Sequence, residues 1–228
     1  MMKKLLIIGV VAAVVVSSAI FIPPLVEGYR FMHTLAAQDA ENEAHGGPWP
    51  QIQDTCVGCH GFRGQSRNAR YAALAGQDAA YLEAQLAAFA DGRRRHSPQM
   101  SPLALKLKDD QVKHLATYFS RQPAAQVEVP RDDQKLAQQG QALVEARGCA
   151  GCHAPDLSGG LIGPRIAGLG DVYLGDQLLA FKEGRRSDPS GAMNALASSF
   201  SPEDIRAISH YVATLAPKSQ GTPKFTVR

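Results

Sequence analysis

Cys-Val-Gly-Cys-His at residues 56–60 recurs as Cys-Ala-Gly-Cys-His at residues 149–153, and the two copies use all four cysteines of the chain. The order Cys-x-x-Cys-His is typical of c-type haem attachment. Two cysteines on one helical turn can each form a thioether with a haem vinyl group, and the histidine that follows then lies under the iron. The sequence therefore predicts two covalently bound haem c groups. Their tethers would be Cys56, Cys59, Cys149 and Cys152, and their proximal ligands His60 and His153.

Other uses of paired cysteines fit the pattern less well. Two Cys-x-x-Cys units could form a tetrahedral zinc site, act as redox dithiols or form structural disulfides. A zinc site does not require a histidine directly after the second cysteine, and a thioredoxin-like dithiol needs a strand-helix pattern that the sequence does not show. Haem attachment explains both histidines.

Two methionines follow the motif histidines at equal distance. Met100 lies 40 residues after His60, and Met193 lies 40 residues after His153. A single methionine would usually be a flexible core residue, but a matched pair indicates two sixth ligands of iron. A thioether ligand favours ferrous iron and raises the reduction potential. With both axial positions filled, no site is open for oxygen or peroxide, which favours electron transfer over catalysis.

Three other histidines lie within the two copies. His96 and His114 are the rivals of Met100 as iron ligands, but the second copy has no histidine at the corresponding positions. Methionine therefore remains the preferred ligand. His210 has no counterpart in the first copy and is expected at the surface.

The motifs belong to a duplicated segment of about ninety residues, and internal repeats of this kind indicate tandem domains. The copies are offset by 93 residues at the motifs and the methionines, and by 92 between them. The matching positions are Leu74-Ala75-Gly76 with Ile166-Ala167-Gly168, Tyr81-Leu82 with Tyr173-Leu174, Gln85-Leu86 with Gln177-Leu178, and Phe89 with Phe181.

Each copy is predicted to be all-α. Residues 81–89 place their large side chains on one helical face, and Gly92 and Gly184 would end the helices of the two copies. A loop is expected to carry each methionine, followed by a final helix over 109–120 in one copy and 202–215 in the other. An opening helix is expected over residues 134–147. Because each domain is small, the haem would supply part of its apolar core.

The N-terminus carries a long apolar segment. Lys3 and Lys4 precede 18 uncharged residues, Leu5–Ile22, which end at Pro23-Pro24. As a helix, this run would cover roughly 27 Å, close to the hydrocarbon thickness of a bilayer. It could be a cleaved signal peptide, with Ser17-Ser18-Ala19 as the cleavage region. We favour a retained anchor, because the run stays apolar beyond Ala19, and the lysines then place the N-terminus in the cytoplasm.

The charged residues indicate less about binding partners than the motifs indicate about the cofactor. The formal net charge of +3 is too small to suggest nucleic acid, and no motif supports it. Two arginine runs, at 93–95 and 185–186, follow the helix-ending glycines. They fit a solvated turn as well as they fit pairing with haem propionates or docking of an acidic partner.

Taken together, these residues resemble the di-haem cytochrome c4 family, which has two class I cytochrome c domains in tandem. The likeness covers about residues 50–216. It rests on both haem motifs, Leu-Ala-Gly-Gln at 74–77, and Tyr-Leu-x-x-Gln-Leu-x-x-Phe-x-x-Gly-x-Arg at 81–94 with its copy at 173–186. The resemblance implies two all-α haem domains around a pseudo-two-fold axis, and periplasmic electron transfer from quinol-oxidising complexes to terminal oxidases.

One departure from the family concerns the residue before Leu-Ala-Gly. The family tends to have a proline there, whose carbonyl orients the proximal histidine. Pro164 can fill this role in the second domain, whereas Ala72 stands in its place in the first. The carbonyl of Ala72 can serve equally, although the potential of the first haem could then differ.

The expected fold is therefore all-α, with two tandem cytochrome c-type domains related by duplication and preceded by one transmembrane or signal helix. The predicted segments are 1–26, anchor or signal; 27–48, helical stalk; 49–121, first haem domain; 122–133, linker; 134–216, second haem domain; and 217–228, flexible tail.

The expected function is that of an electron carrier, not an enzyme. It would be tethered to the bacterial inner membrane through residues 5–22, with its haem domains in the periplasm. It would pass single electrons from a donor of the cytochrome bc1 type to an acceptor of the cytochrome c oxidase type, or to another respiratory acceptor. The alternative is a dedicated subunit of an oxidase supercomplex or a dehydrogenase. A di-haem peroxidase fits less well, because it needs a displaceable iron ligand.

Overall fold

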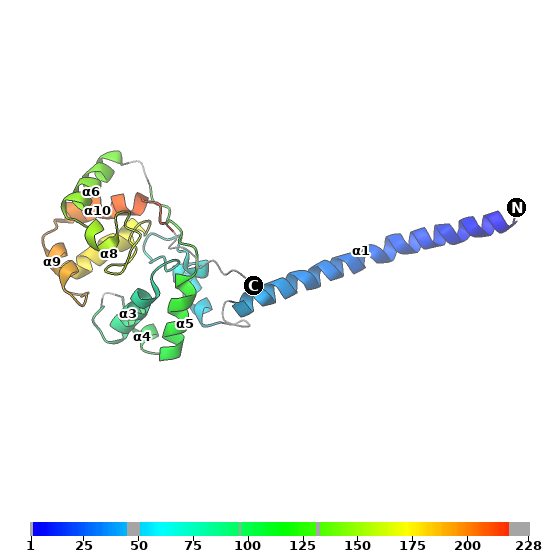
Figure 1. Cartoon of the computed structure of the whole chain (residues 1–228), viewed down its shortest axis with the longest axis horizontal. Helices are drawn as coiled ribbons and strands as arrows, with labels where there is room; N and C mark the ends of the chain where they lie inside the picture. Colours follow the sequence, from blue (N-terminus) through cyan, green and yellow to red (C-terminus); the bar gives the residue numbers. More distant parts are fainter. Residues whose placement is uncertain (1, 45–50, 96, 131–132, 219–228) are drawn as a thin grey trace. The chain divides into compact units, whose positions relative to one another are not determined.

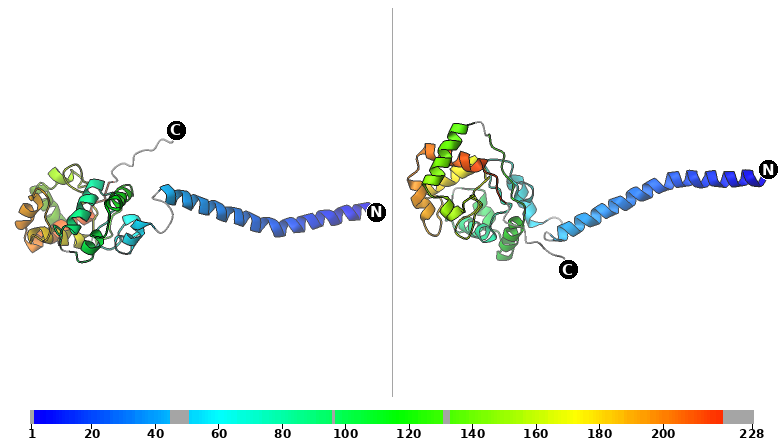
Figure 2. Two further views of the ribbon diagram at one scale, coloured as in Figure 1. Left: turned by 90° about the horizontal axis from the view of Figure 1, so that it is seen from below. Right: turned by 45° about the horizontal axis from the view of Figure 1, so that its top comes forward.

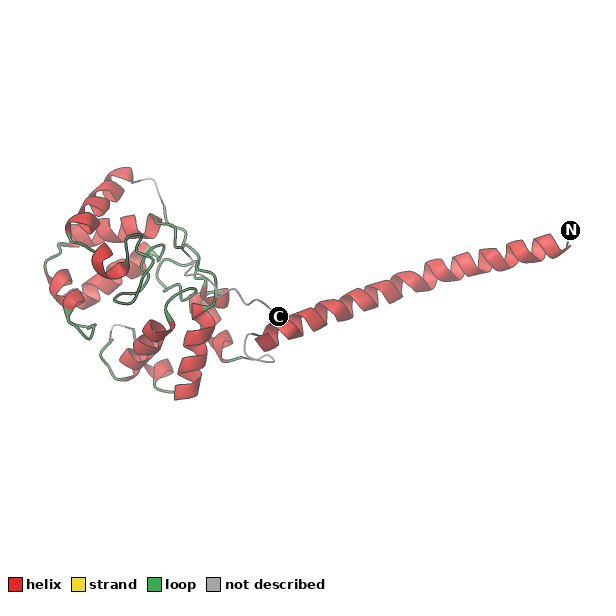
Figure 3. Cartoon of the chain, in the orientation of Figure 1, coloured by secondary structure: helices red, strands yellow, loops and turns green. Residues whose placement is uncertain are grey.

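The computed structural model describes residues 2–44, 51–95, 97–130 and 133–218, and in the first helix it describes the side chains of residues 17–37 and 40. Helices joined by loops make up these residues, with no strand among them (Figure 3). This confirms the all-α prediction. The chain divides into two compact units, Met1–Gln51 and Ile52–Arg228.

The first unit consists of one long helix, α1 (Met2–Ala44), seen in Figure 1. It continues through Pro23 and Pro24, where two backbone hydrogen-bond donors are missing, so the apolar run and the predicted stalk form one helix. No helix among the residues with described side chains is both long and apolar enough to cross a membrane. Residues 5–16 of the predicted membrane segment lie outside that set, as do residues 45–50.

The first copy of the repeat opens the second unit. Its elements are the 3-10 turns η1 (Ile52–Cys56) and η2 (Phe62–Gly64) and the helices α2 (Val57–His60), α3 (Ala79–Ala90), α4 (Met100–Ala104) and α5 (Asp109–Ser120). Asp78 caps α3, because its carboxylate accepts the backbone N–H of Tyr81 at 2.8 Å. Gly92, with φ +78°, ends the turn after α3 as predicted. α3 packs against α4 and α5.

The second copy follows the same order with one more helix at its start. Its elements are α6 (Gln134–Ala146), α7 (Ala150–His153), α8 (Asp171–Lys182), α9 (Ala192–Ser198) and α10 (Pro202–Thr214). α10 packs against α6 and α8, and α6 and α10 lie side by side in Figures 1 and 2. A Cβ atom at Gly140 of α6 would overlap the carbonyl of Ala207. Glycine therefore sets the close approach of these two helices.

Capping residues next to Pro202 explain why α10 begins there. Ser201 accepts the backbone N–H of Asp204 at 3.1 Å, and the Asp204 carboxylate accepts that of Ser201 at 2.9 Å. With Pro202 at the first helical position, this capping box satisfies donors that would otherwise lack partners. The predicted helix start is confirmed.

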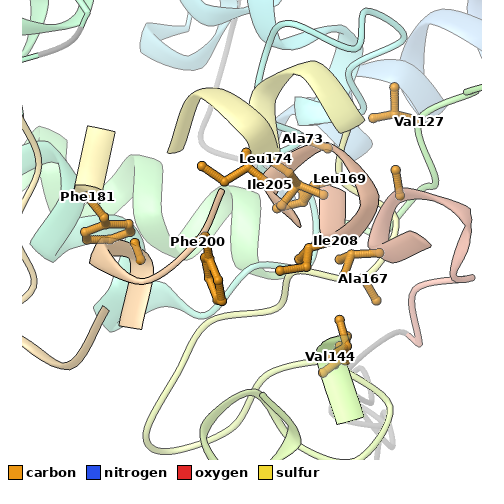
Figure 4. Packing of buried hydrophobic residues seen from close by; sticks show 14 residues of the cluster. Ala73, Val127, Val144, Ala167, Leu169, Leu174, Phe181, Phe200, Ile205 and Ile208 are labelled. Atoms are coloured by element: carbon orange, nitrogen blue, oxygen red, sulfur yellow. The ribbon is translucent and has the colours of Figure 1, made fainter. Parts of the chain in front are cut away.

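The apolar cores of the two copies differ in size. The second-copy core contains fourteen buried apolar residues, whereas the first-copy core contains four, Leu82, Leu115, Ala116 and Phe119. Figure 4 shows the second-copy core, which also takes in Ala73 from the first copy and Val127 from the connecting segment. The connected apolar cluster of the first copy is therefore the smaller of the two among the described residues, although further apolar side chains such as Ala88 and Phe89 are also buried there.

The segment between the copies has no helix or strand over residues 123–130. It nevertheless lies closely on the second copy. The Val127 side chain is fully buried, its N–H donates to the Gly168 carbonyl at 2.9 Å, and the Gln126 side chain donates to the Ala213 carbonyl at 2.9 Å. These contacts attach the connection to the second copy.

Candidate haem-binding sites

Each haem motif forms a single short helix. α2 carries Cys59 and His60 directly after Cys56, and α7 repeats the arrangement after Cys149. The four cysteines are free of disulfide bonds, and burial raises the pKa of the Cys56 and Cys149 thiols. Among the described residues, no three His, Cys, Asp or Glu side chains form a metal-binding group. The cysteines are thus arranged as the thioether chemistry of haem c requires, one helical turn apart.

Each motif histidine is oriented by a backbone carbonyl. The Nδ1 atom of His60 lies 2.8 Å from the carbonyl oxygen of Ala72, and that of His153 lies 2.8 Å from the carbonyl oxygen of Pro164. Because a carbonyl can only accept, Nδ1 carries the proton and the lone pair of Nε2 is free to bind a metal. The Ala72 carbonyl therefore takes the orienting position in the first copy, where the family tends to have proline.

The protonation of both histidines also suits iron. Burial lowers the pKa of His60, the hydrogen bond to Ala72 opposes this, and the charge of Arg94 lowers the pKa further. His153 follows the same pattern, with burial first and Arg186 as the neighbouring charge. A neutral imidazole is the form that binds metals.

The two methionines lie in the first turns of short helices, not in loops as predicted. Met100 begins α4, and Met193 is the second residue of α9. The N–H of Met100 donates to Ser97 Oγ at 3.3 Å, whereas that of Met193 donates to the carboxylate of Asp188 at 3.0 Å. In both copies a side chain that precedes the methionine therefore accepts its backbone N–H, which the hydrophobic pattern does not reveal.

The side chain of Asn194 also stabilises the turn that contains Met193. Asn194 Nδ2 donates to the carbonyls of Phe181 and Arg186, both at 2.8 Å. Met193 and Cys149 pack against the same second-copy core, and Cys56 packs against the first-copy core. In the second copy, the motif residue Cys149 and Met193 therefore lie against the same apolar cluster.

The rival histidines have other surroundings. His114 Nε2 lies 3.3 Å from Gln53 Oε1, and His96 lies outside the described residues. The prediction for His210 was wrong: only 7% of this residue is exposed. It lies in α10 among buried neighbours, a placement that alignment with the first copy could not show.

The two copies meet through the turns that precede the methionines. Arg94 and Arg186 form an isolated antiparallel bridge. Beside it, the N–H of Arg95 donates to the Arg185 carbonyl at 2.8 Å and the N–H of Ser187 donates to the Arg93 carbonyl at 3.2 Å. The two segments that lead to Met100 and Met193 therefore both begin at this contact between the copies.

Side chains of the two copies add reciprocal hydrogen bonds to this contact. The Arg94 guanidinium donates to the Tyr173 hydroxyl at 3.0 Å, and the Arg186 guanidinium donates to the Tyr81 hydroxyl at 2.8 Å. Each arginine also stacks on a phenylalanine ring of its own copy, at 4.3 and 4.4 Å. Burial alone would raise the pKa of Tyr173, but the two guanidiniums hold it below its ordinary value.

Sequence reasoning grouped these arginines with their neighbours and did not separate their roles. Arg94 and Arg186 are buried at 5% and 6% exposure, whereas Arg93 and Arg185 are exposed and pair with Asp91 and Glu183 at 2.6 Å. The sequence does contain one signal that separates the two roles. In both copies the buried arginine is the second residue after the helix-ending glycine.

The two Cys-x-x-Cys-His motifs and their methionines fit two covalent c-type haems. Bound haem supplies one-electron chemistry at iron, while the protein orients the histidines, sets their protonation and places charges around them.

Comparison with known proteins supports this assignment. The sequence profile of the cytochrome c family matches residues 51–122 and again residues 137–216. Cytochrome c4 of Thiocapsa roseopersicina is 31% identical over 192 residues, covering 76% of this chain and 99% of the relative. The thiosulfate dehydrogenase electron acceptor of Stutzerimonas stutzeri strain A1501 is 30% identical over 211 residues, covering 87% and 97%.

A solved structure gives the same result. The crystal structure of reduced recombinant cytochrome c4 from Pseudomonas stutzeri is similar with a TM-score of 0.64 and 31% identity, covering 72% of this chain and 94% of that one. The profile match, these relatives and the two haem motifs agree on one conclusion. The chain belongs to the cytochrome c4 family of di-haem electron carriers, with two tandem cytochrome c domains.

Proposed function

We propose that this chain passes single electrons in the periplasm from a quinol-oxidising complex of the cytochrome bc1 type to a terminal oxidase or another respiratory acceptor. In this proposal His60 and Met100 ligate the first iron, His153 and Met193 ligate the second, and the motif cysteines are the covalent tethers. The observation that carries it is the matched pair of histidines, each with Nδ1 against a backbone carbonyl and each followed 40 residues later by a methionine.

The two-domain arrangement supports a relay of electrons within the molecule. The antiparallel bridge at Arg94 and Arg186 connects the segments leading to both methionines. A contact built from buried hydrogen bonds fixes the two haem domains against each other, and a fixed separation favours transfer from one haem to the other. We place these domains at residues 49–121 and 134–216, with the linker at 122–133 and the tail at 217–228, of which residues 219–228 lie outside the described part of the chain.

The N-terminal segment is proposed to direct the protein to the membrane. Residues 1–26 would act as a retained anchor or a cleaved signal, with Lys3 and Lys4 in the cytoplasm, and residues 27–48 as the connector to the haem domains. The support is the 18-residue uncharged run, Leu5–Ile22. A tether would keep the carrier close to membrane-bound partners and raise their effective concentration. Fractionation tests this: an anchored holo-protein needs detergent for extraction, and a processed one is found in the soluble periplasmic fraction.

A second candidate function is that of electron acceptor for a thiosulfate dehydrogenase. It is favoured by the relative of that name from Stutzerimonas stutzeri, which is matched over 97% of its length. This corresponds to the alternative of a carrier dedicated to one dehydrogenase. The two candidates differ in the donor, not in the haem chemistry.

Carbon monoxide tests whether both irons are fully ligated. The visible spectrum of the dithionite-reduced holo-protein is recorded before and after addition of the gas. No change at either haem is expected, because both axial positions are filled. A shift in about half the haem would mean that one site is open, and the di-haem peroxidase would then replace the carrier.

Reduction kinetics then identify the donor. Oxidised holo-protein is mixed in a stopped-flow instrument with a bc1-type complex and quinol, or with a thiosulfate dehydrogenase and thiosulfate. The proposed function predicts faster second-order reduction by the quinol-oxidising complex. Faster reduction by the dehydrogenase would select the second candidate. Omitting quinol or thiosulfate gives the matched control for each donor.

A further inference from the structure

One buried cation lies between the haem-binding segments of the two copies. Arg165 is fully buried, with no exposed surface. It directly follows Pro164, whose carbonyl accepts the Nδ1–H of His153. The corresponding residue of the first copy is Ala73, so the duplicated domain carries this charge only once.

The Arg165 guanidinium reaches into the first copy. It donates to the carbonyl of Ala75 at 2.9 Å and to that of Ala73 at 3.4 Å, and within its own copy to the carbonyl of Ala167 at 2.9 Å. Ala73 is the neighbour of Ala72, whose carbonyl orients His60 at 2.8 Å. The guanidinium therefore donates to the residue that follows Ala72, and Arg165 is itself the residue that follows Pro164.

The first copy also binds the backbone of Arg165. Gln77 Nε2 donates to the Arg165 carbonyl at 2.9 Å, and the Arg165 N–H donates to Gln77 Oε1 at 3.0 Å. Gln77 is itself buried at 4% exposure. Side chain and backbone of Arg165 are thus both attached to the first copy, so the position of the charge is fixed relative to both proximal segments.

Among the described residues, no carboxylate pairs with this guanidinium. Its acceptors are neutral carbonyls, and Nε has no hydrogen-bond partner. In the described parts of the chain, no salt bridge involves Arg165. Burial lowers its pKa to about 10, so the group remains charged at neutral pH. An unpaired charge in the protein interior is poorly screened and acts over a longer range than a surface charge.

Ferric haem carries one more positive charge than ferrous haem, so a fixed positive charge nearby favours the reduced form. We propose that Arg165 is a positioning and electrostatic residue shared by the two haems, and that its buried charge raises the reduction potentials of both. The inference rests on the proposed assignment of His60 and His153 as proximal ligands. It adds a residue, Arg165, that would influence both haems without ligating either iron.

Spectroelectrochemical titration of the holo-protein tests the charge directly. Arg165→Met removes the charge and keeps much of the buried stem, and both potentials are expected to fall. A change on the order of tenfold in each redox equilibrium corresponds to about 59 mV for a one-electron couple. Arg165→Lys keeps the charge and is expected to preserve both potentials largely. Arg206→Met, which removes an exposed arginine of α10, should move neither.

Three results would overturn the proposal. A fall at only one haem would show that the charge is not shared. Equal falls in the Met and Lys variants would assign the effect to packing, and unchanged potentials in Arg165→Met would remove the role. If Arg165→Met does not assemble, Arg165→Gln provides a neutral side chain that can still donate to a carbonyl. The charge-transfer band of methionine-ligated ferric haem serves as a separate check, because its absence from the unsubstituted protein would contradict the ligand assignment and not the role of Arg165.

Discussion

Gln177 accepts hydrogen bonds from the two buried arginines that join the copies. Its Oε1 atom lies 2.6 Å from a nitrogen of Arg94 and 2.8 Å from one of Arg186. In Gln177→Leu both arginines keep Gln85 and a tyrosine hydroxyl as acceptors, but Nη1 of Arg186 loses its acceptor. Because this donor is buried, the substitution should lower the free energy of unfolding by about 1–3 kcal/mol. Urea unfolding of the holo-protein measures this loss.

An exposed glutamine provides the control for this prediction. Gln141 lies on the surface of α6 and donates to Glu145 at 2.9 Å, so Gln141→Leu should change the stability by less than about 0.5 kcal/mol. Similar losses in the two variants would show that the acceptor position of Gln177 has no special importance.

Asp188 is the residue that fastens the second methionine. Burial would raise its pKa, but hydrogen bonds from Ser190, Met193 and Ala192 more than offset this and hold the pKa below its ordinary value. Because the folded-state pKa is lowered, the carboxylate stabilises this turn above about pH 4, and the contribution is lost as the pH falls through the lowered pKa. Asp188→Ala should therefore let added imidazole displace the methionine of the second haem on the order of tenfold more readily at pH 7, about 1.4 kcal/mol.

The corresponding change in the first copy is the control. Ser97→Ala removes a longer bond of 3.3 Å to the Met100 N–H, and its effect on imidazole binding should be smaller. The difference between Asp188→Ala and the unsubstituted protein should also shrink as the titration is moved to acid pH. A difference that stays constant with pH would contradict the role of the ionised carboxylate.

At the scale of the elements, the start of α8 lies directly against the first copy. The N–H of Tyr173 donates to the Ala69 carbonyl at 2.8 Å, and a Cβ atom at Gly170 would overlap the same carbonyl group. Gly170→Ala should therefore separate the copies locally and cost about 1–3 kcal/mol of unfolding free energy. Thermal and urea unfolding both report this loss.

The same helix offers a matched substitution. A Cβ atom at Gly175 of α8 would make only ordinary contacts, 3.7 Å to Ser209 and 3.9 Å to Ile205. Gly175→Ala should stabilise the protein by up to about 1 kcal/mol, since alanine is the better helix former. Destabilisation by both substitutions would show that the space around Gly170 does not decide the result.

At the scale of the whole molecule, the two domains should respond differently to the loss of haem. The first-copy core is a cluster of four buried apolar residues, whereas the second-copy core has fourteen, of which all but Ala73 and Val127 belong to the second copy. Replacing Cys56 and Cys59 by serine should therefore leave α3 and α5 with little protection against hydrogen exchange, because the remaining core is too small. Replacing Cys149 and Cys152 should leave α6 and α10 with partial protection. Mass spectrometry of exchanged peptides measures both, and equal loss in the two domains would contradict this account.

The sequence by itself determined the cofactor, the family and most helices. The haem motifs are local in sequence, so their spacing alone predicts the chemistry. The bounds of α5 and the start of α10 follow from periodicity and capping residues, which act within one or two turns. The equal separation of Met100 and Met193 from their histidines came from comparing the copies with each other, and their ligation of iron stays a prediction.

Only the tertiary structure decided which residues join the domains. Alignment of the copies matches Arg94 with Arg186, but it cannot tell which face of one copy meets the other, and so it left a solvated turn, pairing with haem propionates and docking of an acidic partner equally open for these arginines. It also gave no reason to notice Arg165, whose counterpart is an alanine, or the burial of His210. The physical reason is common to all three: haem attachment and helix ends depend on neighbours in sequence, whereas the surroundings of a buried charge come from segments up to 92 residues away.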